Sequence, residues 1–274
     1  MEEVKWIVLI SIPLIVTFAV KKFFRELLYH PYCLKENYKK KLIPVCGGIV
    51  FAPSFFASIF LINLLGHSVE YQEVILIALS LISFVGFADD LIGDTKVKGL
   101  KGHILRLIKG KPTTGSLKAL GGLLIAAFVS YEIAGISLIE VTIDSLIIAL
   151  FTNLLNLLDL RPGRCAKGFL LLSLLFLLIG RGKPEFLFIL FVIVLVYLPE
   201  DLKAQLMMGD TGSNVLGMAS GIAAILLFNF YEKLIILFAL ILFHLFTEKY
   251  SLTAIIEKNK FLNYLDMLGR KGEE

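Results

Sequence analysis

Charged side chains are scarce in this sequence. Asp, Glu, Lys and Arg make up 18% of its residues, against about 25% in a typical soluble domain. Hydrophobic residues reach 57%, and the mean hydropathy is +0.83. This composition excludes an ordinary soluble domain and predicts an integral membrane protein.

Cysteine and histidine are also sparse, with three and four residues respectively. The spacing of Cys33, Cys46 and Cys165 matches no zinc-binding pattern. The first apolar run has neither a basic leader nor a small-residue cleavage site, so we expect no cleavable signal peptide. The sequence has no evident internal repeat, which argues against a transporter built from paired broken helices.

Long apolar runs are abundant, and they set the expected fold. Runs of about 18 or more apolar residues with few charges predict transmembrane helices. We expect an all-α polytopic membrane protein, a single domain over residues 1–274, with about nine spans. These lie near residues 5–20, 45–66, 72–88, 117–137, 141–158, 167–180, 186–198, 212–230 and 233–248. The sixth and seventh runs are short, which leaves eight or ten spans as alternatives.

The basic residues are distributed unevenly between the connecting segments. Of the 27 Lys and Arg residues, 23 fall on one alternate set of segments. The positive-inside rule places that set in the cytoplasm, with the N-terminus outside and the C-terminus inside. The net charge of +4 mostly reflects this asymmetry, so nucleic-acid binding is not needed to explain it.

The stretch GFADDLIGD, residues 86–94, places Asp89, Asp90 and Asp94 where the third span ends. On a helix Asp90 and Asp94 share one face, and Asp89 points about 100° away. A solvated helix end neutralised by nearby lysines would explain these acids. Carboxylates at membrane depth are costly, however, and tend to mark functional sites. Such acids suit Mg²⁺, which favours one or two carboxylates together with substrate phosphate.

A second polar pattern lies in TNLLNLLDLRPGRCAKG, residues 152–168. Asn153, Asn156 and Asp159 recur every three residues and form a polar stripe on a leucine-rich helix. Hydrogen bonding between helices would satisfy these groups. The stripe ends in a carboxylate on the expected cytoplasmic side, which favours a ligand site. Arg161 and Arg164 flank a Pro-Gly turn and could bind phosphate.

Two further stretches complete the pattern on this side of the membrane. In MMGDTGSNVLG, residues 207–217, Asp210 stands where the eighth span begins. It could cap that helix, or it could hold a cation beside an anion-binding helix N-terminus. KKKLIPVCGGIVF, residues 39–51, makes a flexible Pro-Gly entry into the second span. Residues 99–116 suggest a basic amphipathic helix at the membrane interface, in which His103 is more plausibly interfacial than catalytic.

These patches, in this order, resemble the polyprenyl-phosphate N-acetylhexosamine-1-phosphate transferases. This superfamily includes the phospho-MurNAc-pentapeptide translocase and the bacterial GlcNAc-1-phosphate transferases. The resemblance covers roughly residues 20–270 and rests on Pro44-x-x-Gly47-Gly48, Asp89-Asp90, Asn153-x-x-Asn156-x-x-Asp159 and Met208-Gly209-Asp210-Thr211-Gly212-Ser213.

The resemblance implies Mg²⁺-dependent transfer of a phospho-sugar from a UDP-sugar to a polyprenyl phosphate, with release of UMP. Mn²⁺ is the alternative ion, the plasma membrane is the expected location, and a homodimer is left open. The implied metal ligands are Asp210 and Asn156, and the implied catalytic pair is Asp89 and Asp90. The expected substrate-binding residues are Lys41, Lys118, Asn153, Asp159, Arg161, Arg164 and Arg270.

Two departures from the family pattern concern the donor. The family usually continues Asp-Gly-x-x-Gly-Leu after the asparagine stripe, whereas Asp159 is followed here by LRPGR. The last cytoplasmic segment carries Asp266 and Arg270 where relatives have a histidine cluster. These differences leave a catalytically silent relative, which binds polyprenyl phosphate or a partner enzyme, as the main alternative to an active transferase. A transporter is the third reading.

Overall fold

A computed structural model describes residues 2–93, 114–182 and 184–270 of the chain, and almost all of its secondary structure is helical. The long helices are α1 Glu2–Leu28, α2 Phe51–Leu64, α3 Gln72–Ile92, α5 Thr114–Ala134, α6 Leu138–Leu158, α7 Arg164–Ile179, α8 Glu185–Leu202, α9 Gly209–Leu227 and α10 Phe230–Lys249. The short elements are 3₁₀ turns η1 Pro31–Cys33 and η2 Gly47–Val50, strands β1 Leu34–Glu36 and β2 Leu42–Pro44, and helices α11 Leu252–Lys258 and α12 Lys260–Met267.

Each predicted span overlaps one of the long helices, and the all-α polytopic membrane fold is confirmed. Within the described residues, six helical segments are long and apolar enough to cross a membrane: α1, η2 with α2, α3, α5, α6 and α10. The other long helices do not combine the length and the apolar composition of these six, for physical reasons. α7 has 16 residues, short of the about 20 that a span needs, and α8 carries three acidic residues. A count of nine spans stays a prediction.

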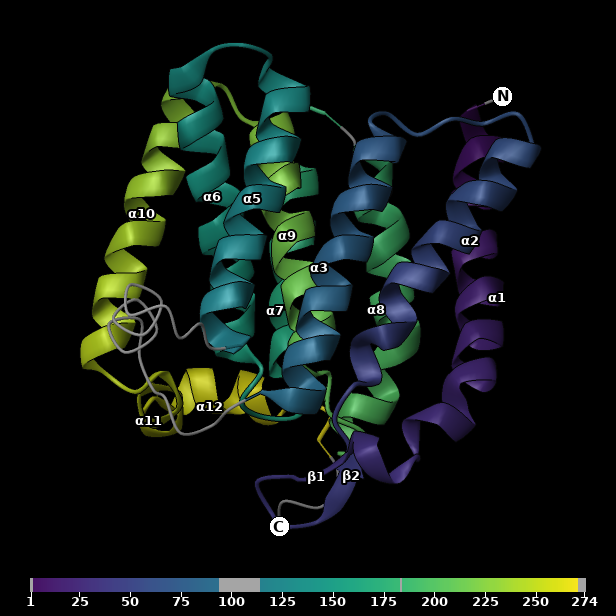
Figure 1. The fold of residues 1–274 in the computed structure, drawn as a ribbon, viewed down its shortest axis with the longest axis vertical. Coiled ribbons are helices and arrows are strands. Elements are labelled where there is room, and N and C mark those ends of the chain that lie inside the picture. Colours follow the sequence, from purple (N-terminus) through teal and green to yellow (C-terminus); the bar gives the residue numbers. More distant parts are fainter. Residues whose placement is uncertain (1, 94–113, 183, 271–274) are drawn as a thin grey trace.

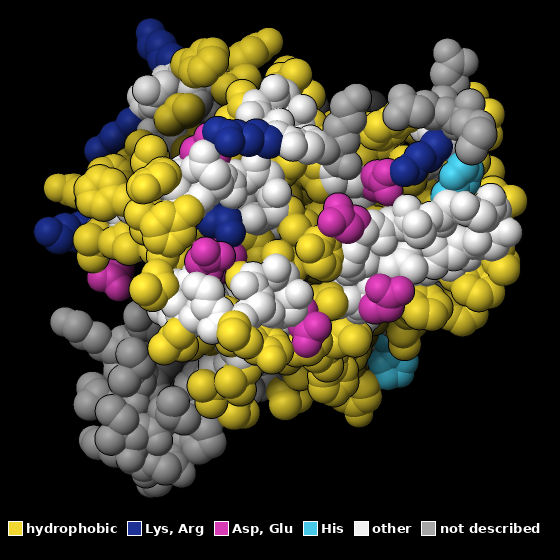
Figure 2. Space-filling model, turned by 90° about the horizontal axis from the view of Figure 1, so that it is seen from above, with side chains coloured by type: hydrophobic (Ala, Val, Ile, Leu, Met, Phe, Trp, Pro, Cys, Tyr) yellow, Lys and Arg dark blue, Asp and Glu magenta, His cyan; other side chains and the backbone are white. Residues whose placement is uncertain are grey.

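The long helices run up and down in one bundle, so alternate connections meet at the same end (Figure 1). The β1–β2 hairpin and the short helices α11 and α12 lie at one end, which we call the hairpin end. α3, α6 and α8 finish there, and α5, α7 and α9 begin there. Viewed along the bundle from the opposite end, apolar side chains make up most of the rim (Figure 2). The four polar patches of the sequence all fall at the hairpin end.

α9 forms the centre of the bundle, and almost all of its residues are buried. It packs against α3, α5, α6, α7 and α8. The small residues of α9 permit this close packing, as is common between membrane helices. A Cβ on Gly217 would lie 2.4 Å from Thr152 Cα of α6, and one on Gly221 would lie 2.5 Å from Ile148 Cα. Because its neighbours are protein rather than lipid, α9 does not need the apolar surface of a lipid-facing helix.

η2 lies close against the backbone at the start of α9. A Cβ on Gly48 would lie 2.1 Å from Gly212 Cα and 2.4 Å from Gly212 N. Both are backbone atoms, so Gly48→Ala must push η2 away from α9. We expect this substitution to lower the free energy of unfolding by about 1–3 kcal/mol, measured by thermal unfolding in detergent.

Gly121→Ala is the matched control for Gly48→Ala, because its new Cβ would meet only Val85 Cγ2, at 3.8 Å. Gly121 lies inside α5, so the control should gain up to about 1 kcal/mol of helix propensity. Equal melting temperatures for the two variants would contradict the tight η2–α9 contact.

Candidate functional site

Two of the sequence patches are joined by backbone hydrogen bonds at the hairpin end. β1 and β2 pair antiparallel, with Lys35 opposite Ile43. Beyond β2, Met207 N donates to Pro44 O at 2.7 Å, and Gly47 N and Gly48 N donate to Met207 O and Met208 O, each at 2.9 Å. The segment PVCGG therefore fixes the residues that lead into GDTGS. Gly209, at φ +71°, makes the turn into α9, where a Cβ would collide with Val45 O at 2.2 Å.

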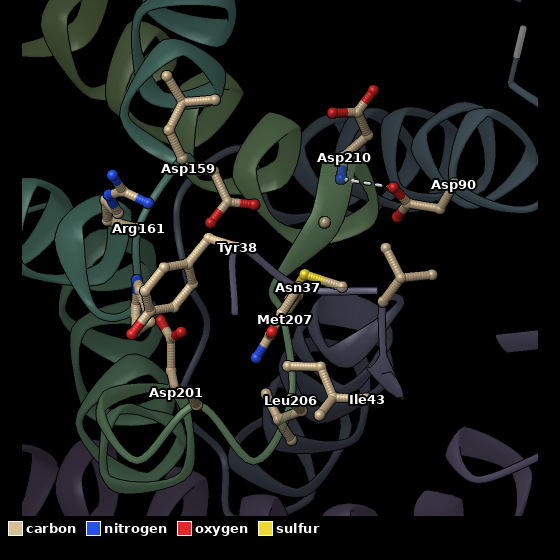
Figure 3. A pocket seen from close by; sticks show the side chains of 15 residues that line it. Asn37, Tyr38, Ile43, Asp90, Asp159, Arg161, Asp201, Leu206, Met207 and Asp210 are labelled. Atoms are coloured by element: carbon tan, nitrogen blue, oxygen red, sulfur yellow. Dashed lines mark hydrogen bonds between the residues drawn. The ribbon is translucent and has the colours of Figure 1, made fainter. Parts of the chain in front are cut away.

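Asp90 caps α9 from the end of α3. Its Oδ1 accepts from Asp210 N at 2.9 Å (Figure 3). Its Oδ2 accepts from Thr211 N at 2.9 Å and Thr211 Oγ1 at 2.5 Å. The first amides of a helix have no partners within the helix and favour an anion. The capping role that the sequence leaves open for Asp210 is therefore filled by Asp90. Asp90 orients the helix end that carries Asp210.

Lys118, in the first turn of α5, connects the remaining polar residues. Its Nζ makes a short contact with Asp210 Oδ2 and lies 3.7 Å from Asp89 Oδ2. When the Asn156 amide is oriented to satisfy its neighbours, its oxygen accepts from Lys118 Nζ at 3.0 Å and its nitrogen donates to Asp210 Oδ1 at 2.7 Å. Residues from α3, α5, α6 and α9 thus meet at one point. We call Asp89, Lys118, Asn156 and Asp210 the carboxylate–lysine cluster.

Lys35 is a second cation in this region that sequence reasoning missed. It lies on β1, and its Nζ makes a short hydrogen bond to Asp90 O. The resemblance places Lys41, not Lys35, near the nucleotide site, and Lys41 is exposed in the turn between β1 and β2. The strand register explains the difference, because Lys35 pairs with Ile43 beside the site whereas Lys41 precedes β2. Lys41 as a substrate-binding residue stays a prediction.

A cavity of about 190 Å³ opens next to the cluster (Figure 3). The β1–β2 turn, the end of α6 and the segment between α8 and α9 supply its walls. Four carboxylates line it, those of Asp90, Asp159, Asp201 and Asp210. Burial and the charges of the other three acids raise the pKa of Asp159 well above its usual value. Because four acidic side chains line the cavity, it is suited to hydrogen-bond donors rather than to phosphate.

Arg161 and Tyr38 form the wall on one side of the cavity. The Arg161 guanidinium lies over the Tyr38 ring, 4.9 Å from its centroid, and pairs with Glu257 at 3.3 Å. Such cation–π contacts hold both planar groups in place. Arg161 lines the cavity, and its role as a substrate-binding residue stays a prediction. Tyr38 is an addition that its isolated position in the sequence did not signal.

Asp201 is a further cavity residue that the sequence analysis missed. Only 3% of it is exposed, and its Oδ2 has no hydrogen-bond partner within the described structure. Burial raises its pKa to about 7, although Gly163, Arg270 and Lys167 oppose the shift. A carboxylate directly after an apolar run is the kind of feature that marks functional sites. That signal was present in YLPEDLK.

The raised pKa of Asp201 predicts a pH-dependent stability. The folded protein binds the proton more tightly than the unfolded chain, so stability falls as pH rises from about 4 to about 7 and is level above. Asp201→Asn replaces the titrating carboxyl group by a neutral amide, so the variant should not lose stability over this pH range. We expect the variant to match wild type near pH 4 and to melt at a higher temperature at pH 8. Glu200→Gln is the control, and an equal gain in that variant would contradict the assignment.

The last two basic residues expected at the site, Arg164 and Arg270, both bind Asp266 of α12. Arg164 Nε and Nη2 donate to the two carboxylate oxygens at 2.8 and 2.9 Å, and Arg270 Nη2 donates to Oδ1 at 2.7 Å. Arg270 Nε also donates to Pro162 O at 2.8 Å. We call Arg164, Asp266 and Arg270 the arginine clamp. The arginine clamp fixes the turn at Pro162 and Gly163. Neither Arg164 nor Arg270 is among the residues that line the cavity.

Some expected residues lie apart from the cluster or outside the described chain. Asn153 is exposed on α6, one turn before Asn156, and does not line the cavity. Asp94 and most of the basic segment 99–116, including His103, lie outside the described residues. Asn153 as a substrate-binding residue stays a prediction.

The oxygen atoms of the carboxylate–lysine cluster fit a hard divalent cation. Within the described residues no three His, Cys, Asp or Glu side chains could hold a metal by themselves. Mg²⁺ does not require that, because it is usually held by one or two carboxylates together with substrate phosphates and waters. Oxygens of Asp210, Asn156 and Asp89 already converge on one cation, the Lys118 ammonium. These residues therefore suit the ion that the sequence predicts.

Comparison with known proteins identifies the class of this fold and site. Residues 73–228 match the model of glycosyl transferase family 4, and the chain belongs to this family. It is similar to the phospho-N-acetylmuramoyl-pentapeptide-transferases of Clostridium perfringens strains SM101 and 13, each 26% identical over 205 residues. These alignments cover 70% of this chain and 62% and 64% of the relatives, so the chain matches less than two thirds of their length.

Proposed function

We propose that this protein transfers a phospho-sugar, phospho-N-acetylhexosamine, from a UDP-sugar to a polyprenyl phosphate such as undecaprenyl phosphate. The products are a lipid-linked diphosphate sugar, for cell-envelope glycan synthesis, and UMP. The observation that carries the proposal is the carboxylate–lysine cluster, which draws oxygen ligands from separate helices to one point at the hairpin end. The family match supports phospho-sugar transfer as the reaction class.

The proposed site faces the cytoplasm at the level of the lipid headgroups. The distribution of Lys and Arg supports this orientation. A nucleotide-sugar donor is water-soluble, whereas the acceptor phosphate lies at the bilayer surface. A site at the hairpin end, where loops meet spans, is accessible to both substrates.

The residues have distinct proposed roles. Asp210 and Asn156 would hold Mg²⁺ or Mn²⁺, which when bound would neutralise the donor diphosphate and make UMP a better leaving group. Asp90 keeps the N-terminus of α9 in place through its hydrogen bonds to Asp210 and Thr211. Lys118, positioned beside Asp89, orients the attacking lipid phosphate. Because phosphate oxygen is already a nucleophile near neutral pH, positioning and charge stabilisation supply most of the catalysis.

The acidic cavity is the proposed site for the uncharged, donor-rich part of the nucleotide sugar. Asp159 and Asp201 would accept hydrogen bonds from its N–H or O–H groups, and Tyr38 would contact a planar ring. The diphosphate would lie at the other end, near Lys118 and Lys35. Lys118 contacts Asp210 and Lys35 donates to Asp90 O, whereas Asp159 and Asp201 lie across the cavity from Asp90 and Asp210 (Figure 3), and this supports the orientation of the donor.

A donor panel tests the proposed function. Purified protein is incubated with undecaprenyl phosphate, Mg²⁺ and a series of UDP-sugars, and UMP release is measured. We expect UMP with at least one UDP-N-acetylhexosamine, and only when the lipid is present. If no donor reacts while undecaprenyl phosphate still binds, the protein is a silent relative.

A further inference from the structure

The position of Lys118 has a consequence for how the site takes up a metal ion. Its ammonium lies between Asp210 Oδ2, Asn156 Oδ1 and Asp89 Oδ2, the last at 3.7 Å. These oxygens belong to the residues that fit the divalent ion. An ammonium nitrogen and a metal ion cannot share one position, since both would need the same oxygen atoms. An ion bound by all three oxygens would take the position of the ammonium nitrogen, so Lys118 would leave it.

The charges explain why an ammonium group occupies this position. Asp89 and Asp210 both face the same point, and Asp90 is beside them. Carboxylates in partly desolvated surroundings repel each other strongly unless a cation lies between them. The side chains of Lys118, Asp89 and Asp210 are each between 18 and 22% exposed, so water screens this repulsion only partly.

We infer that Lys118 is an exchangeable internal cation: it neutralises the cluster in the absence of metal, competes with Mg²⁺ for Asp210 and Asn156, and is released toward the substrate phosphates when the ion binds. The flexible four-carbon stem of lysine permits such a movement. The inference rests on the proposed function for the identity of the ion. It adds a role for Lys118 in coupling metal uptake to phosphate binding.

Competition predicts that removing the ammonium strengthens metal binding. If Lys118 fills the position in nine of ten molecules, its removal raises the apparent affinity about tenfold. The same removal leaves Asp89 and Asp210 without their cation, so the metal-free variant should be less stable and Mg²⁺ should restore it. A lysine that only supports the metal ligands would give the opposite result, a weaker affinity.

The test uses isothermal titration of Mg²⁺ into the purified full chain in detergent, without substrates. We expect Lys118→Met to bind about tenfold more tightly than wild type, with a larger rise in melting temperature on adding Mg²⁺. Lys21→Met is the matched control, because Lys21 is a partly buried lysine paired with Glu200 outside the cluster. Its Mg²⁺ affinity should equal that of wild type. An unchanged or weaker affinity in Lys118→Met would overturn the inference.

A second measurement needs no variant, in case Lys118→Met does not fold. Acylation of lysines by an amine-reactive reagent is followed by mass spectrometry with and without Mg²⁺. We expect Mg²⁺ to increase labelling of Lys118 and to leave Lys21 unchanged, and constant labelling of Lys118 would overturn the inference.

If wild type and Asp210→Asn bind Mg²⁺ equally, the proposed metal site fails as well. If only Asp210→Asn loses binding, that site stands, and the Lys118 results alone decide the inference.

Discussion

Asp210→Asn should lower Mg²⁺-dependent UMP release by about a thousandfold or more. Loss of a charged metal ligand removes several kcal/mol of transition-state stabilisation, and about 4 kcal/mol corresponds to a factor of a thousand. The substitution keeps the shape of the side chain. Asp90 binds the backbone of Asp210 rather than its carboxylate, so the cap of α9 is retained. The effect should therefore fall on catalysis and metal affinity and not on folding.

The measurement for Asp210→Asn is the rate of UMP release at saturating Mg²⁺, with the melting temperature recorded beside it. Glu140→Gln, in the first turn of α6 and far from the hairpin end, is the matched control and should retain the wild-type rate. Full activity in Asp210→Asn would show that the metal is held elsewhere.

Asp266→Asn should lower the free energy of unfolding by about 3–5 kcal/mol, the usual cost of removing one partner from a buried ion pair. The arginine clamp is almost fully buried, with Arg164, Asp266 and Arg270 side chains 5, 6 and 3% exposed. Replacing the carboxylate by an amide removes the negative charge to which both buried guanidinium groups are bound. Although burial opposes it, the two arginines hold the pKa of Asp266 below its usual value, so the carboxylate is ionised at neutral pH.

Thermal or denaturant unfolding in detergent measures the effect of Asp266→Asn. Glu257→Gln is the matched control, because Glu257 also pairs with an arginine of the same turn, Arg161, but its side chain is 54% exposed. Exposed pairs contribute about 0–1 kcal/mol. Similar losses of stability in both variants would show that the clamp does not hold α12.

The turn at Pro162 should also loosen in Asp266→Asn, so the KM for the donor should rise more than kcat falls.

Much of the architecture could be predicted because membrane helices leave a strong signal. Runs of apolar residues located the long helices, and the patches at their ends indicated one polar site. α9 was harder to interpret, since it is surrounded by protein and its glycines and serines serve packing. Its depth in the bundle depends on contacts such as Gly217 with Thr152, which no local pattern encodes.

The residue types that make up the site could be predicted from the sequence, but the role of each residue could not. Asp89 and Asp90 are adjacent in sequence and look equivalent. In the fold one faces Lys118 and the other caps α9, because consecutive residues on a helix point about 100° apart. The fork of Arg164 suggested phosphate binding, but its partner Asp266 is distant in sequence. Lys35 and Asp201 were missed because their proximity depends on a strand register and on the packing of α8.

Electron paramagnetic resonance of bound Mn²⁺ tests the central claim most directly, by detecting phosphorus nuclei close to the ion. The account predicts one Mn²⁺ per chain, with phosphorus coupling from the UDP-sugar and, in a separate sample, from undecaprenyl phosphate, and no such site in Asp210→Asn. An ion that binds without coupling to either phosphate, or that binds equally in Asp210→Asn, would contradict it.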